Sequence, residues 1–328
     1  MSSNTNWAIV ATVDEPPVLV QAFVSWHISL GAEAIYLYCD RPDDLVADQF
    51  EGHPHVKVTR CDAAHWARLG KSRPQRHEVR QVLNANDAYA RCAVEWLAHI
   101  DADEFLAPRD SIEAVLQSLP VDVDSLVVPV AERVHLPDDA ADDIFGGAFR
   151  RPFRGSKAEA RVLFGAEDEL TYRGLTGHAQ GKVFLRTGRQ ARLSIHRAKP
   201  TGDEQPLILS RADPAELELL HFDGLTPLHW RYKQLRMLRA LERDGGMPPS
   251  PHRARQAAAL VRRGLDHDGF YHQLKSPAVE VARHLSAHDL LRLPPDGFLQ
   301  GIEMRATAEC DDWLRREKGD VLSYEPDK

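Results

Sequence analysis

The first hundred residues alternate between strand-like and helix-like patterns, and this alternation constrains the fold more than any other feature. Trp7–Val13 and Ala34–Tyr38 are short apolar runs rich in β-branched or aromatic residues, as is typical of buried strands. Between them, a Pro-Pro pair begins a segment with apolar residues at helical spacing, and Gly31 stands where a left-handed C-cap belongs. This strand–helix–strand unit predicts parallel strands joined by a right-handed crossover.

The alternation continues as far as residue 130. The sequence predicts further strands over His55–Thr59, Trp96–Ile100 and Asp124–Val130, with a helix from Arg76 to about Glu95. Asp110 and Glu113 form a capping-box variant that predicts a helix over Ile112–Leu119. We therefore expect an α/β fold with a mostly parallel, Rossmann-like sheet and flanking helices.

The pattern changes after residue 130. We expect a long loop over 135–180, and a hairpin formed by Lys182–Arg186 and Ala191–His196. A helix is predicted from Thr226 to about Arg243, followed by a linker at Gly245–Pro249 and helices near 250–263 and 276–292. The expected organisation is one domain over 1–244 and a helical C-terminal extension over 245–328.

Composition excludes several classes of protein. The 328 residues include 41 basic and 49 acidic side chains, a net charge of −8, which argues against a dedicated nucleic-acid-binding protein. No apolar run approaches the ~18 residues of a membrane span. The N-terminal residues lack the pattern of a signal peptide, and the four cysteines form no Cys-x-x-Cys pair. We expect a cytoplasmic protein without a transmembrane segment.

The most informative motif is an Asp-x-Asp sequence that follows a predicted strand. Trp96–Ile100 leads directly into Asp101 and Asp103. Ligands of open α/β sheets bind beyond the carboxyl ends of the strands, and two carboxylates placed there can share one Mg²⁺ or Mn²⁺ ion. Such a cation neutralises phosphate oxygens. The alternative is a solvated turn, because Asp-x-Asp is a common sequence.

This segment resembles the hallmark of bacterial family 2-like glycosyltransferases with a GT-A fold, Trp-x4-Asp-x-Asp-Glu-Phe-Leu. Relatives of that family include a galactosyltransferase-like group once called a domain of unknown function. Weaker likenesses follow in the family's order over residues 7–235. They are Asp14-Glu15, Trp26-His27-x-x-Leu30-Gly31, Gln81 with Asn84, Gly181-Lys182-x-x-x-Arg186 with His196, and His221-Phe222 with Tyr232-Lys233.

The sequence departs from the family pattern at two places. Asp14 replaces the usual Asn after the first strand, which loses an amide donor. After the second strand, Cys39-Asp40-Arg41-Pro42-Asp43-Asp44 replaces the usual Asp-Asn-x-Ser-x-Asp, although Asp40 or Asp43 could still meet the base or ribose.

The resemblance implies transfer of a sugar from a nucleotide-sugar donor, with a uridine-diphosphate sugar as the expected donor, to a hydroxyl of a glycan or lipid-linked acceptor. It implies that Asp101 holds donor ribose or metal, that Asp103 binds Mn²⁺ or Mg²⁺, and that His196 or its rival His221 is the third ligand. Lys182 and Arg186 would neutralise the diphosphate, and Asp14, Glu15 and Asp40 would contact the donor. The alternative for the basic pair is a solvated hairpin face.

Two further roles stay open at this point. An inverting transferase needs a carboxylate as general base, for which Glu132, Asp223 and Glu104 are candidates, and Glu104 could instead satisfy backbone N–H groups of its turn. A retaining enzyme needs no such base. The C-terminal basic residues Arg253, Arg255, Arg262 and Arg263 would allow peripheral contact with the inner membrane, or form a solvated helix face.

Two other functions compete with the glycosyltransferase. A metal-dependent phosphatase or phosphotransferase of the haloacid-dehalogenase-like group also places Asp-x-Asp after a strand, but usually after the first strand and with Thr or Val where Phe105 stands. A non-catalytic sugar-nucleotide-binding protein would explain the departures at Asp14 and Asp40.

Overall fold

The computed structural model describes residues 5–136, 139, 142–202, 205–244, 249–263, 267–302 and 306–325. The chain forms two compact units, each assembled from two stretches of sequence. The first unit comprises Met1–Pro129 and Gln180–Leu219, and the second comprises Val130–Ala179 and Leu220–Lys328. This division does not follow the predicted boundary at residue 244, and the two units are described separately below.

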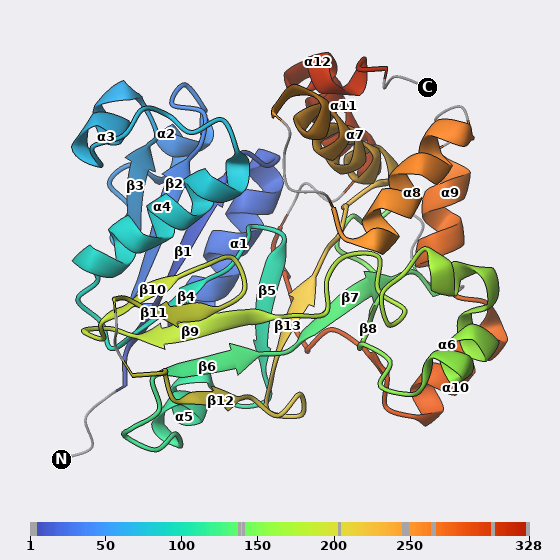
Figure 1. The fold of residues 1–328 in the computed structure, drawn as a ribbon, viewed down its shortest axis with the longest axis horizontal. Helices are drawn as coiled ribbons and strands as arrows, with labels where there is room; N and C mark the ends of the chain where they lie inside the picture. Colours follow the sequence, from blue (N-terminus) through green and yellow to red (C-terminus); the bar gives the residue numbers. More distant parts are fainter. Residues whose placement is uncertain are drawn as a thin grey trace. The chain divides into compact units, whose positions relative to one another are not determined.

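The first unit is built on a seven-stranded sheet in the order β12-β6-β9-β4-β1-β2-β3 (Figure 1). Neighbouring strands run parallel except β9, which is antiparallel to both β4 and β6. The strands are β1 (Trp7–Val13), β2 (Ala34–Cys39), β3 (Val56–Arg60), β4 (Trp96–His99), β6 (Ser125–Val128), β9 (Lys182–Arg186) and β12 (Leu209–Arg211). All seven residues of β1 are buried, as expected for a central parallel strand.

Helices and two smaller strand pairs complete this unit. The helix α4 packs against β1, and β5 (Glu104–Pro108) neighbours β13 (Leu217–His221), whose first three residues belong to the first unit. The strands β10 (Ala191–Leu193) and β11 (Ala198–Pro200) pair with each other. The helices are α1 (Pro17–Ser29), α2 (Val46–Phe50), α3 (Ala63–Arg68), α4 (His77–Arg91) and α5 (Ile112–Gln117).

The strand order places a topological switch point in the first unit. The chain passes from β1 to β2 on one side and later reaches β4 on the other side of β1. Crossovers therefore leave β1 in opposite directions, and open α/β sheets bind their ligands at the carboxyl ends of the strands at such a point. Asp14 and Glu15 follow β1, and Asp101 follows β4, so these side chains belong to that edge of the sheet.

The second unit is mostly helical around short antiparallel strands. The strand β8 (Ala148–Arg150) pairs with both β7 (Val130–Val134) and β14 (Leu291–Arg292). Trp230, Leu260, Phe270 and Leu274 form a core between three helices, α7, α8 and α9. The helical segments are α6 (Lys157–Phe164), the 3₁₀ segment η1 (Gly165–Glu169), α7 (Pro227–Asp244), α8 (Pro251–Arg262), α9 (His267–Lys275), α10 (Val279–Ala287), α11 (Thr307–Glu317) and α12 (Gly319–Leu322).

The predicted fold class is confirmed: the chain is an α/β protein with a mostly parallel, Rossmann-like sheet, flanking helices and a helical C-terminal part. The strands β1, β2, β3 and β4 lie within one residue of their predicted ends, and Gly31 has the predicted positive φ of 93°. Within the described residues, no helix has the length and apolar character required to span a bilayer.

Four local predictions were wrong or incomplete. The predicted hairpin does not form, because β9 enters the large sheet while β10 pairs with β11. The predicted loop over 135–180 contains β8, α6 and η1. Ser111, and not Asp110, caps α5. Two short helices, α2 and α3, were not predicted. Most of the predicted linker, 245–248, lies outside the described residues.

Candidate functional site

The first-unit site begins with the Lys182–Asp101 pair. Because β9 runs antiparallel to β4, with Val183 opposite His99, the first residue of β9 lies beside the end of β4. Gly181 makes this entry possible: its φ is +73°, and a Cβ atom there would stand 2.1 Å from the Val128 carbonyl oxygen. A side chain at position 181 would therefore displace the start of β9 and Lys182 with it.

The buried Lys182 ammonium joins two carboxylates. Its Nζ donates to Asp101 Oδ2 at 2.7 Å and lies 3.4 Å from Glu104 Oε2. Gln81 Nε2 donates to the other Asp101 oxygen at 2.7 Å. Although burial opposes ionisation, the Lys182 charge holds the pKa of Asp101 below its usual range. The Asp101 side chain is still 29% exposed, whereas that of Lys182 is fully buried.

Glu104 stabilises the turn between β4 and β5. Its Oε2 accepts the Asp101 N–H at 2.8 Å, and its own N–H donates to the Asp101 carbonyl at 3.0 Å. The side chain is completely buried. The Glu104 carboxylate therefore has a structural role, since it accepts a backbone N–H of the Asp-x-Asp turn. This geometry does not favour a role as general base.

The Asp-x-Asp carboxylates are suitable ligands for a divalent cation, but the described residues do not form a complete set of metal ligands around them. Asp103 is buried and close enough to influence the ionisation of Asp101. His99 is buried, and its Nε2 has no hydrogen-bond partner among the described residues, while its Nδ1 donates to the Ser194 carbonyl at 3.0 Å. Within the described part of the chain, no group of three or more His, Cys, Asp or Glu side chains is arranged to hold a metal.

The expected third metal ligands lie in different units. His196 belongs to the first unit, and its Nδ1 is 3.0 Å from the Gly181 carbonyl, directly before Lys182. This contact makes Nδ1 a donor and directs the Nε2 lone pair elsewhere. His221 belongs to the second unit, where its Nδ1 lies 3.9 Å from Glu132 Oε2.

Arginines surround the carboxylates at the ends of β1 and β2. Arg41 Nε donates to Asp14 at 2.8 Å. Arg80 forms a bidentate pair with Asp40 at 2.7 and 2.6 Å, and Arg73 lies 3.1 Å from the same carboxylate. Burial opposes the ionisation of Asp40, but hydrogen bonds from His77 and Arg80 hold its pKa below its usual range. This edge of the sheet is therefore rich in fixed charges.

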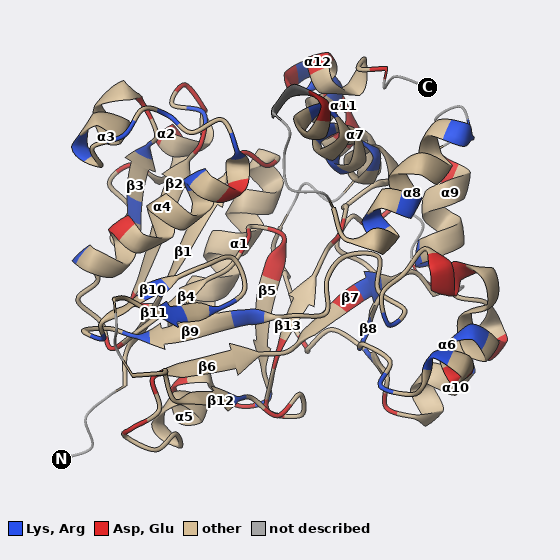
Figure 2. Ribbon diagram, viewed as in Figure 1, with Lys and Arg blue, Asp and Glu red and all other residues tan. Residues whose placement is uncertain are grey.

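Arg186 does not join Lys182. It ends β9 opposite Trp96, at the amino end of β4, and thus at the far end of the strand from Lys182. Figure 2 shows basic residues at both ends of β9. Arg186 is paired with Glu95, and its guanidinium lies 4.3 Å from the Trp96 ring centroid. The expectation that both side chains meet the same diphosphate is therefore corrected.

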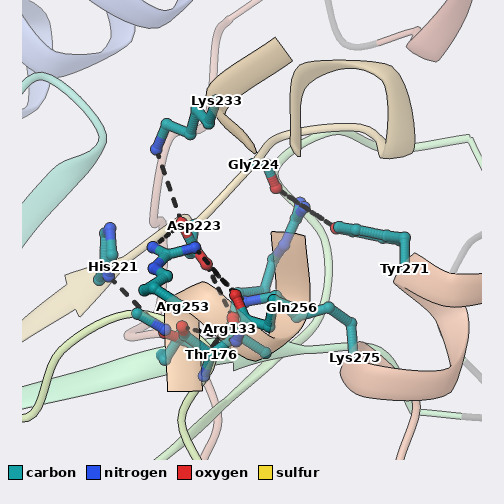
Figure 3. A network of polar contacts seen from close by, with 12 residues as sticks. Arg133, Thr176, His221, Asp223, Gly224, Lys233, Arg253, Gln256, Tyr271 and Lys275 are labelled. Atoms are coloured by element: carbon teal, nitrogen blue, oxygen red, sulfur yellow. Dashed lines mark hydrogen bonds and ion pairs between the residues drawn. The ribbon is translucent and has the colours of Figure 1, made fainter. Parts of the chain in front are cut away.

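Glu132 and Asp223 meet in a buried network of the second unit (Figure 3). Glu132 Oε1 accepts from the Thr176 N–H at 2.7 Å and from Lys275 Nζ at 2.9 Å, and its Oε2 accepts from the Gly177 N–H at 2.6 Å. The Thr176 hydroxyl lies within 2.8 Å of both carboxylates. It carries one proton, so it donates to only one of them at a time.

Asp223 is held mainly by cations from the C-terminal helices. Arg253 Nη2 donates to its Oδ1 at 2.8 Å, and the Lys233 and Lys275 ammonium groups lie within 3.9 Å. Although burial opposes ionisation, these cations hold the pKa of Asp223 well below its usual range, and Lys275 lowers that of Glu132 to about 2. A general base works best with a pKa near the operating pH. The geometry therefore favours a structural role for both expected base candidates.

Sequence reasoning singled out Gln81 and Asn84 but missed Arg80, Arg253 and Lys275 as partners of the carboxylates. Arg80, Gln81, Asn84 and Asp87 form the buried face of α4, together with alanines. Polar residues that recur at helical spacing on the buried side of a helix are a usable signal, because a buried polar group requires a partner. Arg253 and Lys275 gave no comparable signal, because their partners lie 30 and 143 residues away in the sequence.

The comparisons with known proteins give remote likenesses. No family model matches the chain, and no curated protein matches it. HddC from Yersinia pseudotuberculosis has 10% identity and a TM-score of 0.34, covering 66% of this chain and 93% of that one. Residues 1–349 of TarS from S. aureus have 9% identity and a TM-score of 0.34, covering 98% and 81%. The 4-diphosphocytidyl-2C-methyl-D-erythritol synthase from Anaerococcus prevotii DSM 20548 has 9% identity and a TM-score of 0.29, covering 56% and 72%.

Proposed function

We propose that this protein is a glycosyltransferase that binds a nucleotide-sugar donor, a uridine-diphosphate sugar by preference, at the carboxyl edge of the first-unit sheet. The observation that carries the proposal is the Lys182–Asp101–Glu104 cluster at the switch point beside β1. It combines a buried fixed cation with a partly exposed carboxylate, where α/β sheets bind their ligands. The resemblance of the Trp96–Leu106 segment to family 2-like glycosyltransferases supports the same activity.

The donor-binding residues follow from this placement. Asp101 would accept a hydrogen bond from ribose or share a cation, because its side chain retains exposed surface between Gln81 and Lys182. Asp14 and Asp40, with Glu15 beside them, end neighbouring strands and lie among arginines that attract an anionic donor. The Lys182 ammonium group places a positive charge in this site, and its hydrogen bond to Asp101 holds that carboxylate in position.

We also propose that Mn²⁺ or Mg²⁺ takes part, with Asp103 and Asp101 as oxygen ligands and His196, which belongs to the same unit, as a third ligand. When bound, such a cation neutralises the diphosphate leaving group as its bond to the sugar breaks. Since Lys182 already pairs with Asp101, a cation would share that carboxylate with an ammonium group. Substitution of Asp103, the second carboxylate of the motif, therefore tests cation binding while the Lys182–Asp101 pair is kept.

The acceptor side of the proposal is less specific. A hydroxyl of a glycan or lipid-linked glycan in surface polysaccharide synthesis is consistent with the resemblance, as is work at the cytoplasmic side of the inner membrane. Of the basic residues that would contact that membrane, Arg253 is committed to Asp223, and Arg255 donates to the Glu169 carbonyl. Arg262 and Arg263 remain exposed.

The test compares Asp103→Asn with the unaltered protein by calorimetric titration of UDP and several UDP-sugars, with Mn²⁺ and with EDTA. We expect at least one donor to bind more tightly with Mn²⁺. Asp103→Asn should remove that increase, a loss of roughly tenfold or more for one charged ligand contact of about 1.5–3 kcal/mol. Asp122→Asn, which neutralises an exposed carboxylate of the same unit, is the matched control.

The outcomes separate the competing functions. Absence of binding for every donor, with and without metal, would refute the glycosyltransferase. Binding without sugar transfer to any glycan acceptor would favour the non-catalytic binding protein. Phosphate release from simple phosphoesters that Asp101→Asn abolishes would favour the phosphatase, in which that carboxylate is the nucleophile.

A further inference from the structure

Arg150 is a buried cation of the second unit that none of the roles above uses. It ends β8 and stands directly opposite Glu132 of β7 in the antiparallel register. Residues paired in this way project from the same face of the two strands. The Arg150 side chain therefore leaves the sheet on the side of the Glu132–Asp223 network, and the residue is only 2% exposed.

Two of the three guanidinium nitrogens of Arg150 lack hydrogen-bond partners within the described part of the chain. They are the Nε and Nη2 atoms, which are both buried. The Phe164 ring centroid lies 5.5 Å from the guanidinium carbon, and Glu132 and Glu167 act on it electrostatically. Arginine carries five N–H donors, and a buried charge without hydrogen bonds is strongly disfavoured. A buried guanidinium in this state is therefore suited to receive a ligand.

The balance of charges around Arg150 also favours a bound anion. Of the described residues that act on one another electrostatically here, Arg133, Arg150, Lys233, Arg253 and Lys275 are cationic, whereas Glu132, Glu167 and Asp223 are anionic. Arg133 donates to the carbonyls of Ile144, Gly224 and Leu225 and to the Tyr271 hydroxyl. These hydrogen bonds involve neither Glu132 nor Asp223. The two carboxylates are already held by the lysines and Arg253. The cluster therefore has a positive excess that an anion would neutralise.

We propose that Arg150 anchors an oxyanion-binding site in the second unit, for a phosphate or carboxylate group. The planar guanidinium offers two parallel N–H donors, which match the paired oxygens of either group. The site is separate from the donor site of the first unit, so its existence does not depend on the proposed function.

The test measures thermal unfolding of the full chain in chloride, inorganic phosphate and acetate at equal ionic strength and pH. An anion that binds only the folded protein raises Tm as its concentration increases. We expect phosphate or acetate to raise the Tm of the unaltered protein, and Arg150→Met to abolish that rise. In chloride, Arg150→Met should itself raise Tm, because it removes an uncompensated buried charge. A purely structural arginine predicts the opposite sign.

Arg161→Met is the control, since it removes a guanidinium that is 69% exposed on α6 and should leave the anion response unchanged. A response to phosphate alone identifies a phosphoryl group as the ligand, and a response to acetate alone identifies a carboxylate. The proposal is overturned if neither anion stabilises the unaltered protein, or if Arg150→Met responds as that protein does. Arg150→Gln replaces the Met variant if the latter cannot be purified. UDP binding, measured in parallel, should be unchanged in Arg150→Met and in Arg161→Met.

Discussion

At the scale of single residues, His27 shows how a polar side chain on an apolar helix face becomes structural. It is completely buried on α1, where its Nδ1 donates to the Phe23 carbonyl at 2.8 Å. Its Nε2 accepts the Leu106 N–H at 3.1 Å, which ties α1 to the strand that follows the Asp-x-Asp turn. Because both nitrogens are used in this way, the imidazole is neutral in the folded protein.

The pH dependence of stability follows from this burial. Burial lowers the pKa of His27 from 6.5 to about 3, despite the opposing contact with the Phe23 carbonyl. The unfolded chain therefore binds a proton below pH 6.5 that the folded protein excludes, and stability falls as the pH drops from 6.5 toward 3. We expect His27→Gln to be less stable at pH 7, with a deficit that shrinks by up to about 1.4 kcal/mol per pH unit below 6.5.

Urea unfolding of both proteins at pH 7, 6 and 5 measures this difference. His288→Gln, which alters an exposed histidine of the second unit, is the control and should change stability by less than about 0.5 kcal/mol, as is usual for exposed sites. A deficit of His27→Gln that stays constant across the range would contradict the account.

At the scale of elements, the capping of α5 separates what local sequence can and cannot decide. Both Asp110 and Ser111 precede the helix and are suitable N-caps, and only Asp110 has a Glu, Glu113, three residues downstream as in a capping box. The structure selects Ser111, whose hydroxyl accepts the Ala114 N–H at 3.0 Å from an extended backbone conformation. Arg109 is bound to Glu216, by a backbone hydrogen bond and an ion pair, and this fixes the chain one residue before Asp110.

We expect Ser111→Ala to lower the free energy of unfolding by about 1 kcal/mol, because an orphan N–H of the first turn loses its acceptor. Asp110→Ala is the matched variant and should change stability by less than about 0.5 kcal/mol, as is usual for exposed sites. Equilibrium unfolding in urea distinguishes the two. A larger loss for Asp110→Ala would restore the predicted capping box.

At the scale of the whole molecule, the second unit combines distant parts of the chain. Glu132 and Asp223 lie before residue 244, but two of the cations that hold them, Arg253 and Lys275, come from α8 and α9. The core around Trp230 likewise includes Leu260 and Phe270. The predicted extension is thus an integral part of a unit that begins at Val130.

We therefore expect a chain that ends at residue 244 to lose the fold of its second unit. Two buried carboxylates would lose cationic partners, and removing one partner of a buried ion pair costs roughly 3–5 kcal/mol. Circular dichroism and limited proteolysis of the 1–244 fragment test this, with Lys275→Met in the full chain as the milder change. A fragment that unfolds cooperatively with an intact second-unit core would support the predicted boundary instead.

The sequence by itself determined the four neighbouring parallel strands β1 to β4 of the large sheet and the place of the Asp-x-Asp turn. These features depend on local signals: apolar runs of strand length, helical spacing, and Pro or Gly at helix ends. Such signals involve residues within about twenty positions of one another, so they can be interpreted without knowledge of the tertiary fold. They also identified Asp101, and the family resemblance added Lys182; the structure brings the two side chains to 2.7 Å of each other.

The tertiary structure alone decided which partner each polar group receives. The antiparallel entry of β9 separated Lys182 from Arg186, and the pairing of β10 with β11 prevented the predicted hairpin. Lys275, which is 143 residues from Glu132 in the sequence, donates to the Glu132 carboxylate and stabilises it as an anion. Glu132 is therefore poorly suited to act as a base. The physical reason is common to these cases. A buried charge is stabilised by whichever opposite charge the fold brings beside it, and that choice is not encoded in the residues next to it in the sequence.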